Sequence, residues 1–305
     1  MEVSRKEPGS LQSFVERRNK LLFGFIKNYN SKNTQESYIR DLKKFLKFLF
    51  DKFQITEFRA EHAHVVAYKD LLIGEEYGKS SINRMIASAS AYFDYLYQEG
   101  HRKDNPFHRV KRFKENPEGT TQAVALDDLE YITTLIEQGS DTGLLRMAIV
   151  RTLFNSGMRT SALCNLKLSS IERTSSGVLL NVNDKGGKVS KIPLGEKTAT
   201  AIYAYLARRI EVCGPLMQED YLFVSFSRNA KEKMNRRSIH FIFSEIFEIL
   251  EHQKISPHSA RATFISHVIA KEGLLMAQYR ANHSNAQSTV KYSRLNKPSE
   301  PLELI

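Results

Sequence analysis

The sequence predicts a mainly α-helical fold of two domains, the second of which carries a small β-hairpin or sheet. Apolar residues follow helical spacing through the first third of the chain. The segment 112–125 is polar, contains Pro117 and Gly119 and has no periodicity, which is typical of an interdomain linker. Beyond it, GVLLNVND and KVSKIPL alternate around Asp184–Gly187, a pattern that predicts a β-hairpin.

Four helices are expected in the first domain. The first covers LQSFVERRNKLLFGFIKNY, and the second begins at Asn33, because Glu36 three residues later resembles a capping box. The third covers Glu61–Leu72 and the fourth Ser80–Tyr97. This half is expected to be wholly helical and basic.

The second domain is expected to begin with a helix from Leu126 through Ile136 and another over Thr142–Asn155. SGMRTSALCNLKLSSIE then turns at Gly157 into a further helix with Arg159 at its beginning. After the hairpin, helices are expected over Glu196–Val212 and Asn235–Glu251, and the C-terminal segment again reads as amphipathic helices.

The net charge of +11 and the pI near 9.5 favour a polyanionic partner. Residues 1–116 carry 22 basic and 15 acidic side chains and the remainder 23 and 19, so a ligand that touches both halves is expected. A soluble basic protein without such a partner is the alternative. The sequence shows no membrane-length apolar run, no secretory signal and no disulfide or metal-ligand cysteine spacing, so we expect a cytoplasmic protein that binds no membrane and no metal.

The segment from Pro257 to Tyr292 concentrates the residues suited to phosphate chemistry. His258 and Arg261 stand three residues apart and therefore share one face of a helix. A permanent cation, imidazoles that can pass a proton and a phenol predict nucleophilic attack on a phosphate, with His283 and Tyr292 completing the group.

Five stretches together resemble the tyrosine recombinases, the phage integrase and Xer group. NTQESYIRDLKKFLKFL and SSINRMIASASAYFDYLYQEGHRKDNPF resemble helices of the core-binding domain. LFNSGMRTSALCNLKLSSIE resembles the segment of the first catalytic arginine, and VNDKGGKVSKIPLG the hairpin of the catalytic lysine. PHSARATFISHVIAKEG and NHSNAQSTVKYSRL resemble the His-x-x-Arg box, the second histidine and the tyrosine nine residues after it. The resemblance covers about residues 11–295.

This resemblance implies that Tyr292 is the nucleophile and that Arg159 and Arg261 hold the non-bridging phosphate oxygens. It implies that His258 and His283 assist proton transfer and hydrogen-bond the phosphate. The residue types suit these roles, because guanidinium groups neutralise the charge on the phosphate without titrating, and a phenol needs a base or local positive charge to attack at neutral pH.

The resemblance also implies that Lys185 protonates the leaving 5′ oxygen; Lys185 is chosen over Lys188 because it matches the first lysine of the family's Lys-Gly-x-Lys pattern. A covalent 3′-phosphotyrosine stores the bond energy, so no cofactor is expected. Solvated faces are the alternative reading of the basic helices. Otherwise we expect DNA contacts from basic and polar side chains, namely Arg40, Lys43, Lys44, Ser80, Ser81, Asn83, Arg84 and Lys188.

The sequence departs from the family pattern at three places. Ala162 stands where an acidic residue often follows the first arginine by three positions, which puts the support of Arg159 in doubt. The common Leu-Gly-His is here Ala281-Asn282-His283, and the more usual Arg-His is Arg261-Ala262. No proposed catalytic group is removed, so a divergent branch is indicated.

We therefore expect a two-domain clamp around double-stranded DNA, with a lead at 1–10, a helical core-binding domain at 11–112, a linker at 113–121 and a catalytic domain at 122–295. The expected function is site-specific recombination by a tetramer, with the tail 296–305 exchanged between protomers or frayed. A catalytically impaired DNA-binding or architectural protein, and a type IB topoisomerase, remain the alternatives.

Overall fold

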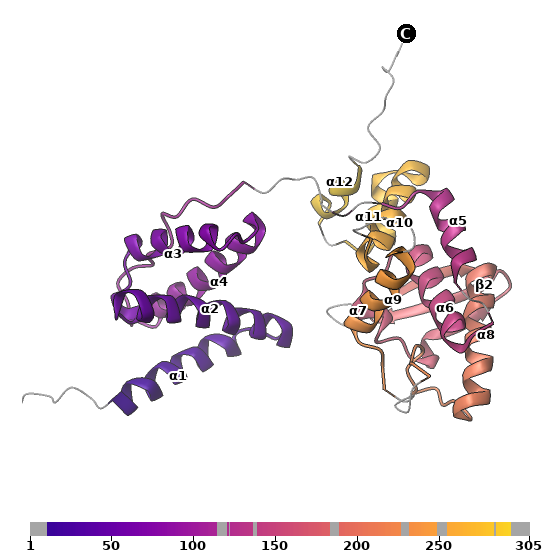
Figure 1. Cartoon of the computed structure of the whole chain (residues 1–305), viewed down its shortest axis with the longest axis horizontal. Coiled ribbons are helices and arrows are strands. Elements are labelled where there is room, and N and C mark those ends of the chain that lie inside the picture. The colour runs from indigo at the N-terminus through magenta and orange to yellow at the C-terminus, as the bar shows by residue number, and fades with distance from the viewer. Residues whose placement is uncertain are drawn as a thin grey trace, which may run out of the picture. The chain divides into compact units, whose positions relative to one another are not determined.

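The computed structural model describes residues 11–114, 121, 123–136, 139–183, 189–226, 232–248, 255–283 and 285–293. The chain divides into two compact units, Met1–Asn116 and Pro117–Ile305, each with its own hydrophobic core. Figure 1 shows the helices of the first unit in indigo and purple, and those of the second from magenta to yellow. No helix of the described ranges is long and apolar enough to cross a bilayer.

The N-terminal unit is helical throughout its described residues. Its elements are α1 (Leu11–Lys27), α2 (Lys32–Phe53), the 3-10 turn η1 (Glu57–Arg59), α3 (His62–Gly74) and α4 (Lys79–Gln98). The core is rich in aromatic side chains, with Phe45 at its centre in edge-on contact with Tyr68, Phe93 and Phe107. The prediction of an all-helical first domain is thus confirmed, but α2 begins at Lys32 after Ser31 and not at Asn33.

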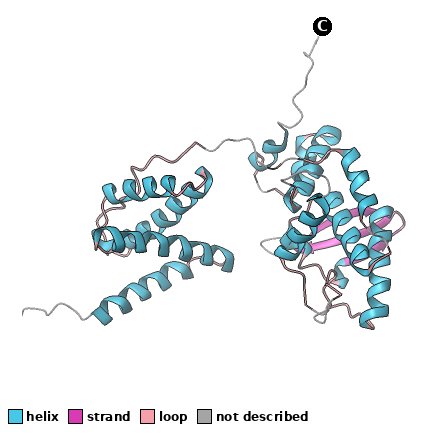
Figure 2. Ribbon diagram, viewed as in Figure 1, coloured by secondary structure: helices cyan, strands magenta, loops and turns pink. Residues whose placement is uncertain are grey.

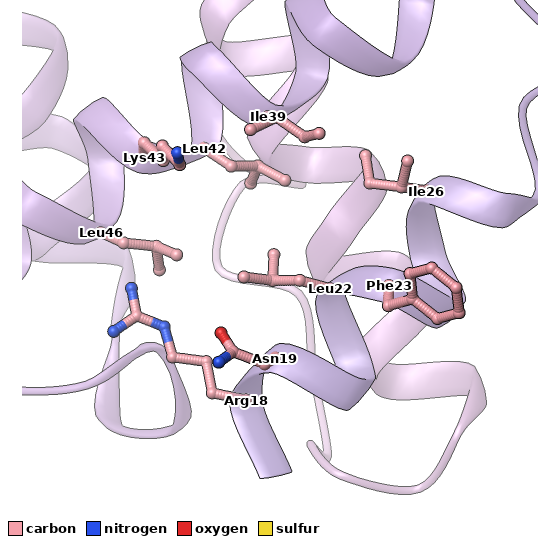
Figure 3. A pocket seen from close by; sticks show the side chains of 9 residues that line it. All are labelled: Arg18, Asn19, Leu22, Phe23, Ile26, Ile39, Leu42, Lys43 and Leu46. Carbon is pink, nitrogen blue, oxygen red and sulfur yellow. The ribbon is translucent and has the colours of Figure 1, made fainter. Parts of the chain in front are cut away.

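A pocket opens between α1 and α2 of this unit (Figure 3). Its polar lining comes from Arg18, Asn19 and Lys43. The other lining side chains are apolar: Leu22, Phe23, Ile26, Ile39, Leu42 and Leu46. Lys43 is the one lining residue that also belongs to the predicted DNA-contacting set.

The C-terminal unit combines helices with one small sheet (Figure 2). Its elements are α5 (Leu126–Leu135), α6 (Asp141–Ser156), α7 (Thr160–Leu163), η2 (Leu168–Ser170), β1 (Ile171–Thr174), β2 (Gly177–Asn183), β3 (Val189–Gly195), α8 (Glu196–Cys213), α9 (Arg236–Glu248), α10 (Pro257–Glu272), α11 (Leu274–Arg280) and α12 (Gln287–Ser293).

The sheet is antiparallel with strand order β1-β2-β3. Its central strand turns Val178, Leu180 and Val182 inward. Helix α8 packs on β2 and β3, and α6 packs on β3 and against α8. The predicted hairpin corresponds to β2 and β3, whose register pairs Val178 with Leu194 and Asn183 with Val189. The hairpin tip, 184–188, lies outside the described residues.

Two features of this unit differ from the sequence prediction. The helix expected after Gly157 is one turn long, and the rest of that segment forms η2 and an additional strand, β1. β1 was not predicted because only Ile171 of its four residues is even half-buried, so its sequence shows no alternation.

Candidate active site

The segment from Pro257 to Tyr292 folds as three short packed helices, α10, α11 and α12. Pro257 occupies the first position of α10, where its missing N–H costs nothing, and the Ser256 N–H donates to Ser259 Oγ at 3.2 Å. This start places His258 in the first turn and Arg261 one turn later on the same face. The helix ends at Gly273, whose φ is +85°.

Arg261 joins the two segments that carry the other predicted site residues. It is only 4% exposed. Its guanidinium donates to the carbonyl oxygen of Gly157 at 2.5 Å, two residues before Arg159, and to that of Ala281 at 2.7 Å, two residues before His283. A buried charge requires such partners, because an unpaired one is costly to remove from water. Arg261 therefore supplies positive charge to the site and also links the α6–α7 turn to the turn before His283.

Gly157 makes this arrangement possible. It ends α6 in the left-handed region, with a φ of +58°, and its Cα lies against the Phe264 ring of α10. A Cβ at this position would come within 2.8 Å of the ring carbon Cγ. Only glycine adopts this conformation and also permits this contact, so the α6–α7 turn can approach α10 closely.

Arg159 follows this turn as the residue that precedes α7, and it is exposed. Its carbonyl oxygen accepts from the Ala162 and Leu163 N–H groups. Ala162 packs against the hydrophobic core, and none of the described carboxylates forms an ion pair with Arg159. The acidic support common in the resembled family thus has no counterpart within the described ranges.

Tyr292 lies on α12, half-buried against the apolar side of α10 and α11. Its hydroxyl is 3.4 Å from His258 Nε2, and its ring lies nearly parallel to that of His283, with the ring centroids 6.2 Å apart and an angle of 13°. The Tyr292 hydroxyl therefore lies near a ring nitrogen of His258, and the Tyr292 ring stacks beside that of His283.

The electrostatics of the site keep both imidazoles neutral at neutral pH. His258 is exposed at the surface, and the partial desolvation of its ring, followed by the charges of Arg261 and Arg159, lowers its pKa. The same causes, with His258 as a smaller one, lower the pKa of His283 to about 4. Burial raises the pKa of Tyr292, and the two arginines oppose this shift.

These shifts also report proximity, because both arginines act on both histidines and on the phenol. The structure thus brings together five of the six residues assigned to catalysis from sequence, namely Arg159, His258, Arg261, His283 and Tyr292. The sixth, Lys185, lies outside the described residues, as does Lys188. No group of histidine, cysteine and carboxylate side chains able to hold a metal ion is found within the described ranges.

The turn before His283 explains one departure from the family pattern. Asn282 has a φ of +48°, in the left-handed region that glycine adopts freely and asparagine tolerates better than other residues. Asparagine in place of glycine therefore preserves the turn. Its side chain also donates to Ser190 Oγ of β3 at 3.3 Å, a contact that links the turn to the hairpin.

The predicted DNA-contacting residues of α2 differ in how they are held. Arg40 and Lys43 are exposed, and Arg40 donates to Ser37 at 3.5 Å. The ammonium group of Lys44 is bonded to Glu75 at 2.5 Å and to the Tyr77 hydroxyl at 2.9 Å. Lys44 is thus already paired within the fold.

The predicted DNA-contacting residues of α4 also include both exposed side chains and side chains that are bonded within the fold. Ser80 is exposed and Ser81 half-buried in the first turn. Asn83 is 8% exposed, and its amide pairs with both the N–H and the C=O of Phe113, which gives it a structural role. Arg84 is exposed but is bonded to the buried Asp41 carboxylate.

Sequence reasoning missed the contacts that hold the catalytic groups in place. The carbonyl groups that brace Arg261 carry no side-chain signature. Thr289, whose hydroxyl lies 2.8 Å from His283 Nδ1, belongs to no recognised motif. The one available signal was its position three residues before Tyr292, which places it on the same helix face.

Comparisons with known proteins support the same family. The profile described as "Phage integrase family" matches residues 123–298, and "Phage integrase, N-terminal SAM-like domain" matches 25–100. The tyrosine recombinase XerC of Myxococcus xanthus is 25% identical over 268 residues, which cover 87% of this chain and 88% of that protein.

Two solved structures share the fold. A complex of the XerH site-specific recombinase with its difH substrate has a TM-score of 0.74 at 14% identity and covers 87% of this chain and 77% of that one. A lambda integrase (75–356) dimer bound to a core site has a TM-score of 0.71 at 16% identity and covers 97% and 99%. The mainly helical fold with a small sheet is thereby confirmed.

Proposed function

The chain belongs to the phage integrase family and is a tyrosine recombinase, an enzyme of site-specific DNA recombination; we propose that Tyr292 is its nucleophile and forms a covalent 3′-phosphotyrosine. The observation that supports this assignment most strongly is the placement of the Tyr292 hydroxyl 3.4 Å from His258 Nε2, in a site that also holds two arginines and a second imidazole.

In the proposed mechanism, the scissile phosphate binds between Arg159 and Arg261, which neutralise its non-bridging oxygens. Phosphate binding offsets the charge of the arginines. His258, neutral before binding, accepts the phenolic proton as the Tyr292 oxygen attacks phosphorus. The bond from phosphorus to the 5′ oxygen breaks, and Lys185 supplies the proton to that leaving oxygen.

Rejoining reverses these steps. A 5′ hydroxyl attacks the phosphotyrosine, and the tyrosine oxygen leaves with the proton returned through His258. The number of phosphodiester bonds is unchanged, so the cycle needs no external energy source. Attack by the 5′ hydroxyl of a different strand gives exchange, whereas attack by the original one restores the starting DNA.

The remaining features of the proposal concern the partners of the chain. We infer a core-binding domain at 11–112 and a catalytic domain at 122–295, both in contact with the DNA recombination site. Of the DNA-contacting side chains predicted in the first domain, Arg40 and Lys43 are exposed and have no carboxylate partner among the described residues, which suits them to phosphate contacts. We also infer assembly into a tetramer on two sites, in the cytoplasm and at the nucleoid.

A covalent-trapping experiment tests the nucleophile. Nicked duplexes taken from the DNA that flanks the gene are incubated with the full chain and separated under denaturing conditions. Wild type is expected to form a DNA adduct and Tyr292→Phe none. A DNA-binding protein without catalysis would shift the duplexes in a native gel and form no adduct in either case.

A two-site plasmid separates the enzyme classes. A recombinase produces deletion or inversion products between the two sites, and Tyr292→Phe produces none. A type IB topoisomerase would relax the supercoiled plasmid and leave the order of its markers unchanged, which would contradict strand exchange as the function.

A further inference from the structure

The Thr289 side chain is buried beside the candidate nucleophile and has one hydrogen-bond partner. Its exposed fraction is 0%, and its hydroxyl oxygen lies 2.8 Å from His283 Nδ1. It makes no other side-chain hydrogen bond to the described residues. Because it stands three residues before Tyr292 on α12, the threonine hydroxyl and the phenol project from the same side of the helix.

A neutral imidazole carries its proton on either Nδ1 or Nε2, and its neighbour decides which. His283 is neutral at neutral pH because its pKa is lowered to about 4. If Nδ1 bore the proton, the Thr289 oxygen would accept it, and the buried hydroxyl proton would have no acceptor among the described groups. If Nδ1 is bare, the hydroxyl donates to it and both groups are satisfied.

The second arrangement leaves the proton on Nε2, which points away from Thr289. The groups that act on the imidazole from elsewhere are Arg261, Arg159 and His258, the residues around the proposed phosphate. His283 then presents an N–H donor to an anion held there. His258 Nε2, 3.4 Å from the phenol, remains the imidazole placed to take the proton.

We propose that Thr289 is a positioning residue, whose hydroxyl holds His283 in the tautomer with the proton on Nε2 and ties that ring to the helix that carries Tyr292. The inference rests on the proposed function, in which His283 contacts the phosphate and Tyr292 attacks it. It divides the labour of the two histidines, His283 as hydrogen-bond donor and His258 as proton acceptor.

The hydrogen bond between Thr289 and His283 also links the position of Tyr292 to that of the His283 ring. α12 is short, seven residues, and Thr289 is its one buried residue. A displacement of α12 that moves Tyr292 away from His258 also breaks the bond from Thr289 to His283. The site then loses its attacking group and the fixed orientation of its donor together.

Three substitutions separate the hydroxyl from the shape of the side chain. Thr289→Val keeps the shape and removes the hydroxyl, whereas Thr289→Ser keeps the hydroxyl. The matched control is Thr152→Val, because Thr152 is also 0% exposed and donates its hydroxyl at 2.7 Å, but to the Ala148 carbonyl of its own helix α6. All three are compared as full chains with verified folding by thermal unfolding.

Two readouts are used. The first is the rate of covalent adduct formation on the nicked duplexes under single-turnover conditions. The second is the His283 tautomer in free ¹⁵N-labelled protein at neutral pH, from long-range ¹H–¹⁵N correlation spectra of the imidazole, with the His283 signals assigned by their loss in His283→Gln. The second readout needs neither DNA nor turnover.

Thr289→Val is expected to lose the Nε2–H tautomer preference and to slow adduct formation about 10- to 100-fold, the range known for removing the partner of a metal-bound imidazole. Thr289→Ser and Thr152→Val are expected to stay close to wild type in both readouts. The inference is overturned if Thr289→Val keeps the tautomer and the rate, or if Thr289→Ser fails as badly as Thr289→Val. Absence of an adduct with wild type would instead defeat the proposed function, and the tautomer spectra would still decide the inference.

Discussion

Replacing Gly157 with alanine perturbs the joint between α6 and α10 that brings Arg159 and Arg261 into one site. Two costs can be worked out from its geometry. A left-handed φ of +58° in a residue with a Cβ costs about 1–2 kcal/mol. The new Cβ would also lie within 2.8 Å of Phe264 Cγ and 3.1 Å of Phe264 Cβ, and overpacking of this kind costs about 1–3 kcal/mol.

Together these costs lower the free energy of unfolding of the C-terminal unit by about 2–5 kcal/mol, which corresponds to a drop of about 4–20 °C in its unfolding temperature. Calorimetry of the full chain measures this, since the two units have separate cores. Gly139→Ala is the control, because Gly139 has no positive φ and no atom within 4 Å of its Cβ position. It is expected to be neutral or slightly stabilising.

The double variant Gly157→Ala/Phe264→Ala identifies the source of the cost. Removal of the Phe264 ring makes room for the Cβ, so the double variant should be more stable than the sum of the two single losses by about 1–3 kcal/mol. An unfolding temperature for Gly157→Ala equal to those of wild type and Gly139→Ala would refute the close packing of this turn on α10. If the losses of the two single variants simply add in the double variant, the clash with Phe264 is not the cause of the destabilisation.

Three further outcomes are expected. The unfolded chain binds a proton on His283 near pH 6.5 and the folded chain only near pH 4, so the free energy of unfolding falls as the pH drops from 6.5 to 4. The loss is at most about 3 kcal/mol, and about 1–2 kcal/mol after solvent screening. In urea unfolding, His283→Gln should flatten the pH dependence of the unfolding free energy in this window. Asn282→Ala should lower the free energy of unfolding, measured by thermal unfolding, by about 1 kcal/mol, because alanine is strained at a φ of +48°. Asn282→Gly should lower it much less, because glycine adopts this conformation freely. Asp41→Ala should lower the unfolding free energy of the N-terminal unit by about 1–3 kcal/mol, because Arg84 loses its carboxylate partner and the buried Ser88 hydroxyl loses its acceptor. An unchanged unfolding transition of that unit would contradict this.

The segments of the site could be predicted from sequence because their residue types and spacing carry the chemistry. His258 and Arg261 were expected on one helix face, and α10 places them so. Their proximity to Arg159, which precedes them by about a hundred residues, followed only from resemblance to a family. Periodicity within one element contains no information about which elements meet.

The contacts that hold the site together were beyond prediction for a physical reason. Arg261 is braced by the carbonyl groups of Gly157 and Ala281, and backbone groups are the same at every position. The turn at Asn282 looked like a weakening of the family pattern until its left-handed conformation was seen. Its side-chain bond to Ser190 depends on a register between hairpin and helix that no local pattern encodes.

Errors in the fold prediction also have local causes. α2 begins at Lys32, one residue before the expected Asn33, and the Gln35 side chain donates to the Tyr29 carbonyl oxygen at 2.6 Å in front of the helix. The strand β1 is mostly exposed and so lacks the alternation by which β2 was found.

The most direct test of the account identifies the residue that becomes linked to DNA. Wild-type protein trapped on a nicked duplex is digested with protease and nuclease, and the remaining nucleotide-bearing peptide is sequenced by mass spectrometry. The account predicts a single adduct on Tyr292 through a 3′ phosphate, absent from Tyr292→Phe. An adduct on any other residue, or an equal yield from Tyr292→Phe, would contradict it.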